Sequence, residues 1–305
     1  MQEIDASVVI CTWNRAPLLD RTLSGMRSLR IPAGLRWELL VVNNNCTDDT
    51  DAVVARHASA LPIRCLHQPV PGKVHAVHMG ISEARGSLLV WADDDVLPSE
   101  GWLEAYVAAR KRWPEAGLFG GPIIPDFEAA PPRWMAATLD QIGGAYGLRD
   151  FGRDLIELTH ETVPFGANFA IPRSVQLEYP YDARLGRSAG RRISGYETRV
   201  MRRMLDDGIP GRWVPDARVG HFVPRSAMST AFLRRFYMSQ GHGNALVARN
   251  RLADQARLFG KPRRLVRRAV EAELAYRIRR LCCQPQTWTR ALVKSSVLWG
   301  KLQSL

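Results

Sequence analysis

Three consecutive carboxylates, Asp93–Asp95, directly follow the apolar segment at residues 87–92. A buried strand that ends in acids places them at the edge where open α/β sheets bind ligands. Three acids this close repel one another unless a cation or strong donors offset their charge. Hard divalent cations such as Mg²⁺ bind carboxylate oxygens and leave positions open for phosphate. The triplet therefore favours a metal and phosphate site, with a solvated turn rich in aspartate as the alternative.

The segments around the triplet alternate between two patterns. Apolar segments of strand length occur at residues 6–12, 37–42, 62–66 and 88–92, with further candidates at 120–125 and 165–171. Helical spacing of apolar residues occurs at residues 16–29, 72–84 and 198–207, and the chain after Pro224 is mostly helical in pattern. Strands that alternate with helices of this length indicate a parallel, doubly wound sheet. We therefore predict an α/β fold, with a mostly parallel sheet between helices and a helical C-terminal extension.

Charge is distributed unevenly along the 305 residues. Residues 226–305 carry 16 Lys and Arg against 3 acids, a balance of +13, whereas residues 1–225 carry 26 against 27, a balance of −1. We therefore expect a near-neutral domain at residues 1–225 and a basic helical extension at residues 226–305. Such asymmetry indicates a polyanionic partner, either nucleic acid or an anionic membrane surface.

The extension itself contains amphipathic helical patterns. Its basic residues include the cluster at residues 263–280 and then Arg290, Lys294 and Lys301 on one face of the last segment. The opposite face of that segment carries Trp288, Leu292 and Trp299. Such a helix suits a membrane interface, but the same pattern suits a helix that packs its apolar face on protein. Both interpretations stay open, and nucleic acid is disfavoured because no recognised binding module accompanies the charge.

Compartment is predicted from three absences in the sequence. The five cysteines show no metal-type spacing, and an odd number without a disulfide framework suggests a reducing compartment. Residues 1–5 carry acids and no apolar core stretch, so we expect no secretory signal there. No apolar run approaches the roughly 20 residues that span a bilayer. We expect a soluble or peripheral protein in the cytoplasm, on the cytoplasmic face of the membrane if the extension contacts lipid.

Seven short motifs resemble, in their order and spacing, the family 2 inverting glycosyltransferases with the GT-A fold. The matching stretches are Val8–Arg15, Glu38–Thr50, Gly80–Gly86, Trp91–Asp95, Gly166–Asn168, Gly195–Thr198, and Val214–Ala217 with His221. Together they cover roughly residues 5–240. The resemblance implies a GT-A domain, a nucleotide-sugar donor, a glycan or lipid-linked acceptor, and Mg²⁺ or Mn²⁺ as cofactor.

In that family the ends of the first strands hold the nucleotide. The resemblance implies that Thr12, Asn14 and Arg15 contact the base and pyrophosphate side of the donor. Asn43 stands where many members carry Asp; its amide both donates and accepts, so base recognition is expected there while the choice of base stays open. The alternative for Asn43 is ordinary turn chemistry. Lys73 lies at a predicted helix N-terminus, where backbone N–H groups favour anions, and is expected to meet a phosphate.

The acid triplet resembles the DxD element of the family. The resemblance implies that Asp93 and Asp94 contact the nucleotide sugar and that Asp95 binds the metal, although the sequence does not decide between Asp94 and Asp95 as the metal ligand. His221 matches a family histidine that joins the metal near the diphosphate. Glu197 occupies the place of the catalytic base, and its alternative is an acid favoured at a helix N-terminus by the dipole.

Two functional hypotheses follow. The first is a metal-dependent inverting glycosyltransferase, with Gly166 and Asn168 on the sugar or acceptor side. The second is a GT-A-like binding protein that has lost turnover and acts through its basic extension. Family members usually carry two adjacent acids at the base position, and this chain has Tyr196 in place of the first. That departure and Asn43 favour the second hypothesis, whereas the intact acids and histidine favour the first.

Overall fold

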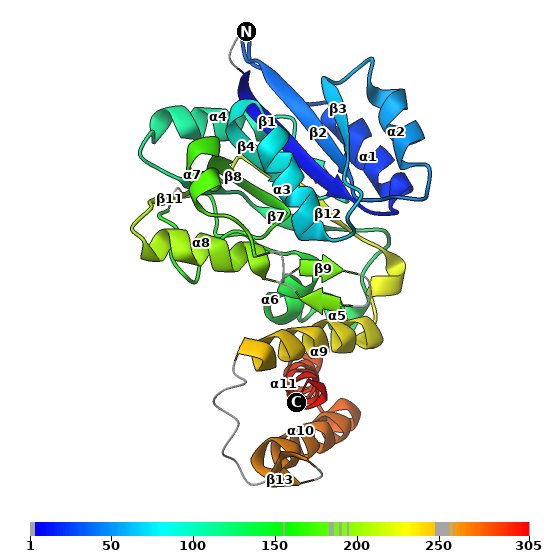
Figure 1. Ribbon diagram of the computed structural model, residues 1–305. Helices are drawn as coiled ribbons and strands as arrows, with labels where there is room; N and C mark the ends of the chain where they lie inside the picture. The colour runs from blue at the N-terminus through cyan, green and yellow to red at the C-terminus, as the bar shows by residue number, and fades with distance from the viewer. Residues whose placement is uncertain are drawn as a thin grey trace. The chain divides into compact units, whose positions relative to one another are not determined.

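The computed structural model describes residues 4–154, 156–182, 186–188, 191–193, 195–247, 257–258 and 260–304 (Figure 1). The chain divides into two compact units. The first unit comprises Met1–Asp126, Gly147–Arg191 and Gly195–Phe222, and the second comprises Phe127–Tyr146, Arg192–Ser194 and Val223–Leu305. The division expected at residue 225 falls close to Val223, but the second unit also includes Phe127–Tyr146 from the middle of the sequence.

The first unit is built on a seven-stranded sheet with the order β11-β6-β8-β4-β1-β2-β3. Its strands are β1 (Ile4–Thr12), β2 (Trp37–Asn43), β3 (Ile63–His67), β4 (Gly86–Ala92), β6 (Leu118–Gly120), β8 (Asn168–Pro172) and β11 (Gly211–Trp213). β1 pairs in parallel with β2 and β4, β2 with β3, and β11 with β6, whereas β8 runs antiparallel to β4 and β6. The prediction of a mixed, mostly parallel sheet is confirmed.

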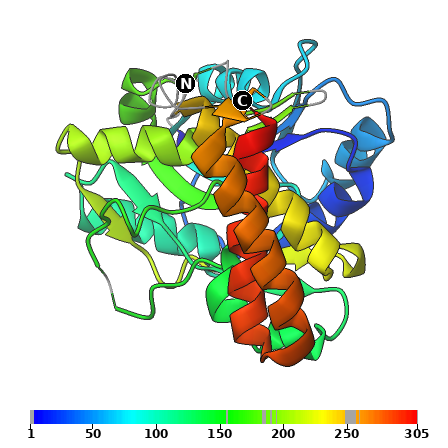
Figure 2. The same ribbon diagram turned by 90° about the horizontal axis from the view of Figure 1, so that it is seen from below.

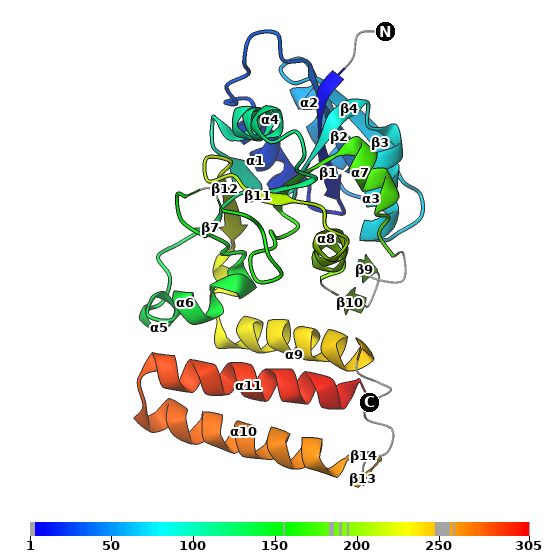
Figure 3. The same cartoon turned by 90° about the vertical axis from the view of Figure 1, so that its left-hand side faces the viewer.

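Helices cover both faces of this sheet (Figures 1 and 3). The helices of the first unit are α1 (Ala16–Met26), α2 (Thr50–His57), α3 (Lys73–Glu83), α4 (Trp102–Arg112), α7 (Arg173–Glu178) and α8 (Tyr196–Asp206). Alternate residues of the strands enter opposite cores, as the period of two requires. Val8 and Ile10 of β1 join the core that contains α1, α2 and α4, and Val9 and Cys11 join the core that contains α3 and α8.

A smaller three-stranded sheet has the order β5-β12-β7, with β5 (Val96–Pro98), β7 (Ile123–Phe127) and β12 (Val219–Val223). Two further short strands of this part of the chain are β9 (Gly186–Ser188) and β10 (Arg191–Ile193). The single strand expected at residues 120–125 is divided into β6 and β7. The pairing of β12 with β5 matters for the candidate site, because β5 begins directly after the acid triplet and His221 of β12 pairs with Val96.

The second unit is helical. It contains α5 (Arg133–Ala136), α6 (Leu139–Ile142), the 3₁₀ turns η1 (Gly143–Tyr146) and η2 (Arg225–Ala227), α9 (Thr230–Val247), β13 (Arg257–Leu258), β14 (Lys261–Pro262), α10 (Arg263–Cys282) and α11 (Pro285–Gln303). α11 packs against both α9 and α10 (Figures 2 and 3). Glycine permits the close approach to α9, because a Cβ on Gly300 would lie 2.0 Å from the Met238 carbonyl oxygen.

Packing decides between the two interpretations of the last helix. Trp288 is 8% exposed, Leu292 is 0% exposed, and both belong to a core with Tyr276 of α10. The apolar face of α11 therefore packs within its own unit, which favours the packing interpretation of this helix over the membrane interpretation. Among the helices in the described parts of the chain, none combines the length and apolarity needed to cross a membrane.

Candidate donor, metal and base site

Strand register brings the predicted nucleotide-binding residues to one edge of the sheet. Thr12 pairs with Asn43, and Ile10 pairs with Ala92, so the acid triplet begins level with the end of β1. Consistent with this register, the Thr12 hydroxyl donates to Asp94 Oδ2 over 2.7 Å. These residues therefore lie together at the carboxyl edge of the strands, and their contact with a nucleotide stays a prediction.

Each acid of the triplet has a donor or cation beside it. Arg15 donates from one nitrogen to Asp94 Oδ1 at 2.6 Å and from the other to Asp95 Oδ2 at 2.5 Å. Lys73 Nζ lies 2.9 Å from Asp93 Oδ1. These two cations offset the mutual repulsion that the sequence predicts for the triplet. Arg15 and Lys73 therefore bind acids in this structure, and their contact with the donor stays a prediction.

At Asp94 and Lys73, burial and the nearest opposite charge act on the pKa in opposite directions. Asp94 is 3% exposed, and its burial raises the pKa of its carboxyl to about 6 although the Arg15 charge acts to lower it. Burial acts to lower the pKa of Lys73, but the charges of Asp93, Cys11 and Asp94 together outweigh that effect and the pKa is raised. Lys73 is therefore a fixed positive charge at neutral pH, close to the edge where a phosphate is expected.

The small sheet places His221 beside Asp95. His221 pairs with Val96 in the β5–β12 register, and the Phe222 N–H donates to the Asp95 carbonyl oxygen over 2.9 Å. His221 Nε2 then lies 3.5 Å from Asp95 Oδ1. A Cβ on Gly147, which has a φ of +84°, would lie 3.1 Å from the imidazole ring, so glycine leaves room for that ring.

This pair fits a divalent cation. Within the described residues, Asp95 Oδ1 and His221 Nδ1 are buried and have no hydrogen-bond partner. A buried carboxylate oxygen without a donor is costly unless something else compensates its charge. Mg²⁺ and Mn²⁺ bind carboxylate oxygens, and Mn²⁺ also accepts imidazole. Asp95 and His221 therefore each have an atom that can bind such an ion and that lacks a hydrogen-bond partner.

Glu197 occupies the first turn of α8, after Gly195 with a φ of +91°. A Cβ on Gly166 would lie 2.6 Å from Glu197 Oε1, so the absence of a side chain at Gly166 makes room for the carboxylate. Burial raises the pKa of Glu197 above the ordinary carboxyl value, and a hydrogen bond from Tyr196 opposes this rise. The structure therefore brings together the predicted base and Gly166, and adds Tyr196 as a direct partner.

Tyr196 is the residue that sequence reasoning treated only as a departure from the family. Its ring is 6% exposed and meets the ring of Tyr181 edge-on, with centroids 5.6 Å apart. Both rings belong to the core on the α3 and α8 face of the sheet. Tyr196 thus fixes the start of α8 by packing and hydrogen-bonds the carboxylate that follows it. The sign of this role in the sequence was that Tyr196 directly precedes Glu197.

Two predicted nucleotide contacts also shape the loops that follow β1 and β2. Asn14 has a φ of +51°, and its Oδ1 accepts from the Thr47 N–H over 2.7 Å. Asn43 Nδ2 donates to Asp51 Oδ1 over 2.8 Å, and Asn43 Oδ1 accepts from the Cys46 N–H over 2.7 Å. The turn chemistry considered for Asn43 is therefore present, and its contact with a base stays a prediction.

Asn168 is fully buried and fully hydrogen-bonded. Its Oδ1 accepts from Trp102 Nε1 and from the Tyr106 hydroxyl, each over 2.8 Å. Its Nδ2 donates to the carbonyl oxygens of Pro122 and Ala217, over 2.9 and 2.7 Å. An amide that uses all of these bonds within the protein has no capacity left for a sugar hydroxyl. This geometry favours a structural role for Asn168 over the sugar contact that we predicted.

Comparison with known proteins agrees with this geometry. The profile of the family described as "Glycosyl transferase family 2" matches residues 7–177, more than half of the chain. The chain belongs to glycosyl transferase family 2. The matched residues include the strand ends, the acid triplet and Gly166. They end before Glu197 and His221, so the roles expected of these two residues as base and metal ligand stay predictions.

Several relatives of this family 2 chain carry names that state a reaction. A glucosyl-dolichyl phosphate glucuronosyltransferase of Haloferax volcanii is 26% identical over 172 residues, which is 55% of this chain and 53% of the relative. A dolichyl-phosphate beta-glucosyltransferase of Trichomonas vaginalis is 34% identical over 101 residues, 30% of each chain. The chain spans about half, or less, of the length of these relatives.

Solved structures show the same fold. A mannosyltransferase of Pyrobaculum calidifontis, in complex with GDP-Man and Mn²⁺, superimposes with a TM-score of 0.59 at 17% identity, covering 98% of this chain and 88% of that one. TarS residues 1–349 of S. aureus, in complex with UDP, gives a TM-score of 0.55 at 12% identity, with 98% and 90% coverage. At these identities the likeness shows the GT-A fold alone, and the predicted fold is confirmed.

Proposed function

We propose that the protein is a metal-dependent inverting glycosyltransferase, which moves a sugar from a nucleoside diphosphate donor to a hydroxyl of a glycan or lipid-linked acceptor. The observation that carries this proposal is the orphaned pair Asp95 Oδ1 and His221 in the same unit as the base candidate Glu197. The named reactions of the two dolichyl-phosphate relatives support a lipid-linked acceptor. A binding protein without turnover receives no comparable support.

In this proposal Glu197 accepts the proton of the acceptor hydroxyl. The bond from the acceptor oxygen to the anomeric carbon forms while the bond from that carbon to the diphosphate breaks, and the diphosphate leaves with the electron pair. Attack on the face opposite the leaving group inverts the anomeric centre. The raised pKa of Glu197 suits this role, because a base is most effective when its pKa approaches the working pH.

The leaving diphosphate needs positive charge around it. Asp95 and His221 would hold a Mg²⁺ or Mn²⁺ ion, which stabilises charge on the departing phosphates. Lys73, at the first residue of α3, adds a fixed cation near the same edge. Arg15 would exchange one or both of its acid partners for phosphate when donor and metal are present. Asp94 then keeps the Thr12 hydroxyl as a donor.

Donor hydrolysis and transfer test this proposal. The purified full chain should bind and slowly hydrolyse one member of a panel of GDP- and UDP-sugars in the presence of Mn²⁺ or Mg²⁺. Addition of excess chelator should stop the reaction, and Asp95→Asn should weaken binding. Full activity in chelator would contradict metal dependence. Binding without turnover of any donor–acceptor pair would favour the binding-protein hypothesis.

We also propose that α10 contacts an anionic lipid surface, which would bring the enzyme to a lipid-linked acceptor. The exposed side of α10 carries an apolar stripe at helical spacing: Val270 is 43%, Leu274 55%, Ile278 62% and Leu281 90% exposed. Seven arginines of the same helix are also exposed: Arg263, Arg264, Arg267, Arg268, Arg277, Arg279 and Arg280. Basic residues beside an apolar stripe match the interface of anionic bilayers.

Substitution tests the lipid contact better than truncation, because removal of α11 would expose the core around Trp288. Leu274→Ser with Ile278→Ser should abolish co-sedimentation with anionic liposomes. Leu177→Ser on α7, at a residue 52% exposed, is the matched control and should leave binding unchanged. Equal sedimentation with neutral and anionic liposomes, or an unchanged α10 variant, would contradict the proposal.

A further inference from the structure

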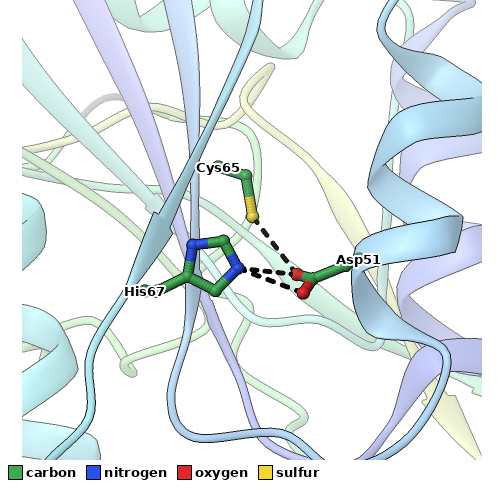
Figure 4. A group of neighbouring side chains, drawn as sticks. All are labelled: Asp51, Cys65 and His67. Atoms are coloured by element: carbon green, nitrogen blue, oxygen red, sulfur yellow. Dashed lines mark hydrogen bonds and ion pairs between the residues drawn. The ribbon is translucent and has the colours of Figure 1, made fainter.

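A second group of metal-binding side chains lies on β3, the edge strand of the seven-stranded sheet. Cys65 and His67 are two residues apart on β3, so their side chains project from the same face of the strand. Asp51, in the first turn of α2, points toward them (Figure 4). These three residues are distinct from the acid triplet and His221. We propose that they form a binding site for a borderline-soft divalent cation of the Zn²⁺ class.

The distances between the ligand atoms are close to those of a tetrahedral zinc site. His67 Nε2 lies 3.0 and 3.1 Å from the two Asp51 carboxylate oxygens, and Cys65 Sγ lies 3.7 Å from Asp51 Oδ1. All three ligand atoms lie within 4.8 Å of one another. Zinc bonds of about 2.0 to 2.3 Å separate tetrahedral ligands by about 3.3 to 3.6 Å. Small side-chain rotations therefore close the site and leave the fourth position for water.

The donor set selects a different metal from the one expected at Asp95. Thiolate, imidazole and carboxylate together suit Zn²⁺ and Co²⁺, whereas Mg²⁺ prefers oxygen ligands alone. The Asp51 carboxylate is already oriented from outside, because Asn43 Nδ2 donates to its Oδ1 over 2.8 Å. Such outer hydrogen bonds are a regular feature of metal-ligating carboxylates. The chain would thus bind two classes of cation at two separate sites.

Proton release distinguishes a metal site from a simple ion pair. A free cysteine thiol is mostly protonated at neutral pH, and a metal must displace the proton of Cys65 in order to bind. A hydrogen-bonded pair of His67 and Asp51 alone, which is the simpler interpretation, needs no thiol. A measurement that detects a metal–thiolate bond therefore distinguishes a metal site from a hydrogen-bonded pair of His67 and Asp51.

Co²⁺ is the probe for this measurement, because a cobalt–thiolate bond gives a charge-transfer band in the near ultraviolet. The background is the full chain with Cys282→Ser and Cys283→Ser, since these exposed neighbouring thiols, 3.6 Å apart, would also bind the probe. Excess Mg²⁺ is present to occupy oxygen-rich sites. We expect the band to saturate at one equivalent of Co²⁺, with release of a proton, and to disappear when Zn²⁺ is added, because Zn²⁺ binds more tightly.

Three variants of that background assign the ligands. Cys65→Ser should abolish the band, and His67→Ala should weaken Co²⁺ binding by more than about tenfold. Cys46→Ser is the matched control, because Cys46 lies in the turn after β2 and contacts Thr12 and Asn14 instead. It should keep the band. No band in the background, or an unchanged band in Cys65→Ser, would overturn the proposal. If Cys65→Ser does not fold, unchanged binding by His67→Ala, whose side chain is 63% exposed, would overturn it equally.

Discussion

The acid triplet and Glu197 are two acidic regions of one unit, and the protein treats their charge in opposite ways. At the triplet, Arg15 bridges Asp94 and Asp95 and Lys73 pairs with Asp93. Glu197 has no such ion pair among the described contacts, and its main hydrogen-bonding side chain is the neutral Tyr196.

This difference in charge compensation indicates that the triplet and Glu197 act in different steps of the reaction. In the proposed mechanism the triplet would hold a cation against the diphosphate, and Asp95 Oδ1, which is buried without a hydrogen-bond partner, would be the oxygen that binds it. At Glu197 burial is the largest effect: it raises the pKa, although the Lys73 charge acts to lower it, and makes the carboxylate a better proton acceptor. We therefore expect substitutions in the two regions to affect different steps, and the following predictions test that separation.

The largest effect is expected from Glu197→Gln. Loss of the proton acceptor should lower kcat by about 10²- to 10⁴-fold with little change in nucleotide affinity. Because the folded-state pKa of Glu197 is raised, its charge destabilises the fold at neutral pH. The Gln variant should therefore have an equal or higher Tm than the wild type. Transfer at a near wild-type rate by a folded Gln variant would remove Glu197 from the base role.

Substitution of the metal ligands should act on binding as well as on turnover. Asp95→Asn and His221→Ala should each lower kcat/KM by about 10²- to 10³-fold, because charge on the leaving diphosphate is no longer offset. Both variants should also weaken Mn²⁺-dependent nucleotide binding, measured by calorimetry. Asp94→Asn, compared directly, identifies the stronger ligand. Unchanged Mn²⁺ dependence in Asp95→Asn would show that Asp95 is not a ligand.

Gly166→Ala tests how closely Glu197 is positioned. The added Cβ would lie 2.6 Å from Glu197 Oε1 and must displace the carboxylate. A displacement of about 1 Å in a catalytic group costs up to about 10²-fold in rate. Gly101→Ala is the matched control, because a Cβ there meets nothing within 4 Å. If both variants keep full turnover, the close contact between Gly166 and the carboxylate has no catalytic importance.

The pH profile should show the smallest effect, a shift rather than a loss. Glu197 acts as a base when ionised, and its raised pKa means that the ionised form is lost at a higher pH than for an ordinary carboxyl group. The acidic limb of kcat against pH should therefore lie above the usual glutamate range. Gly166→Ala should shift the acidic limb, because the added Cβ displaces the Glu197 carboxylate and so changes the surroundings that set its pKa. An acidic limb at the ordinary glutamate pKa would contradict the effect of burial.

Sequence reasoning identified the local parts of this site and missed the parts that depend on distant contacts. The strand before Asp93 was predictable because fully buried strands appear as apolar runs. The structural role of Asn168 depends on Trp102 and Tyr106, more than 60 residues away, and no local pattern reveals such bonds.

The same limit explains the C-terminal helices. Periodicity identified the apolar face of α11 but not what covers it, and the structure places Trp288 in a core. In α10 the sequence showed the cluster of arginines, whereas only the packing shows that Leu274 and Ile278 are exposed beside them. Amphipathic spacing specifies that a helix has a face to bury, and tertiary contacts decide which helix leaves its face free.

The central claim is that Asp95 with His221 binds the donor through a metal, while Glu197 performs a later proton transfer. Calorimetric titration of the donor nucleotide diphosphate, with and without Mn²⁺, tests it directly in the wild type, Asp95→Asn and Glu197→Gln. The account predicts Mn²⁺-dependent binding in the wild type and in Glu197→Gln, and strongly weakened binding in Asp95→Asn. Binding that is independent of Mn²⁺, or equally weakened in both variants, would contradict it.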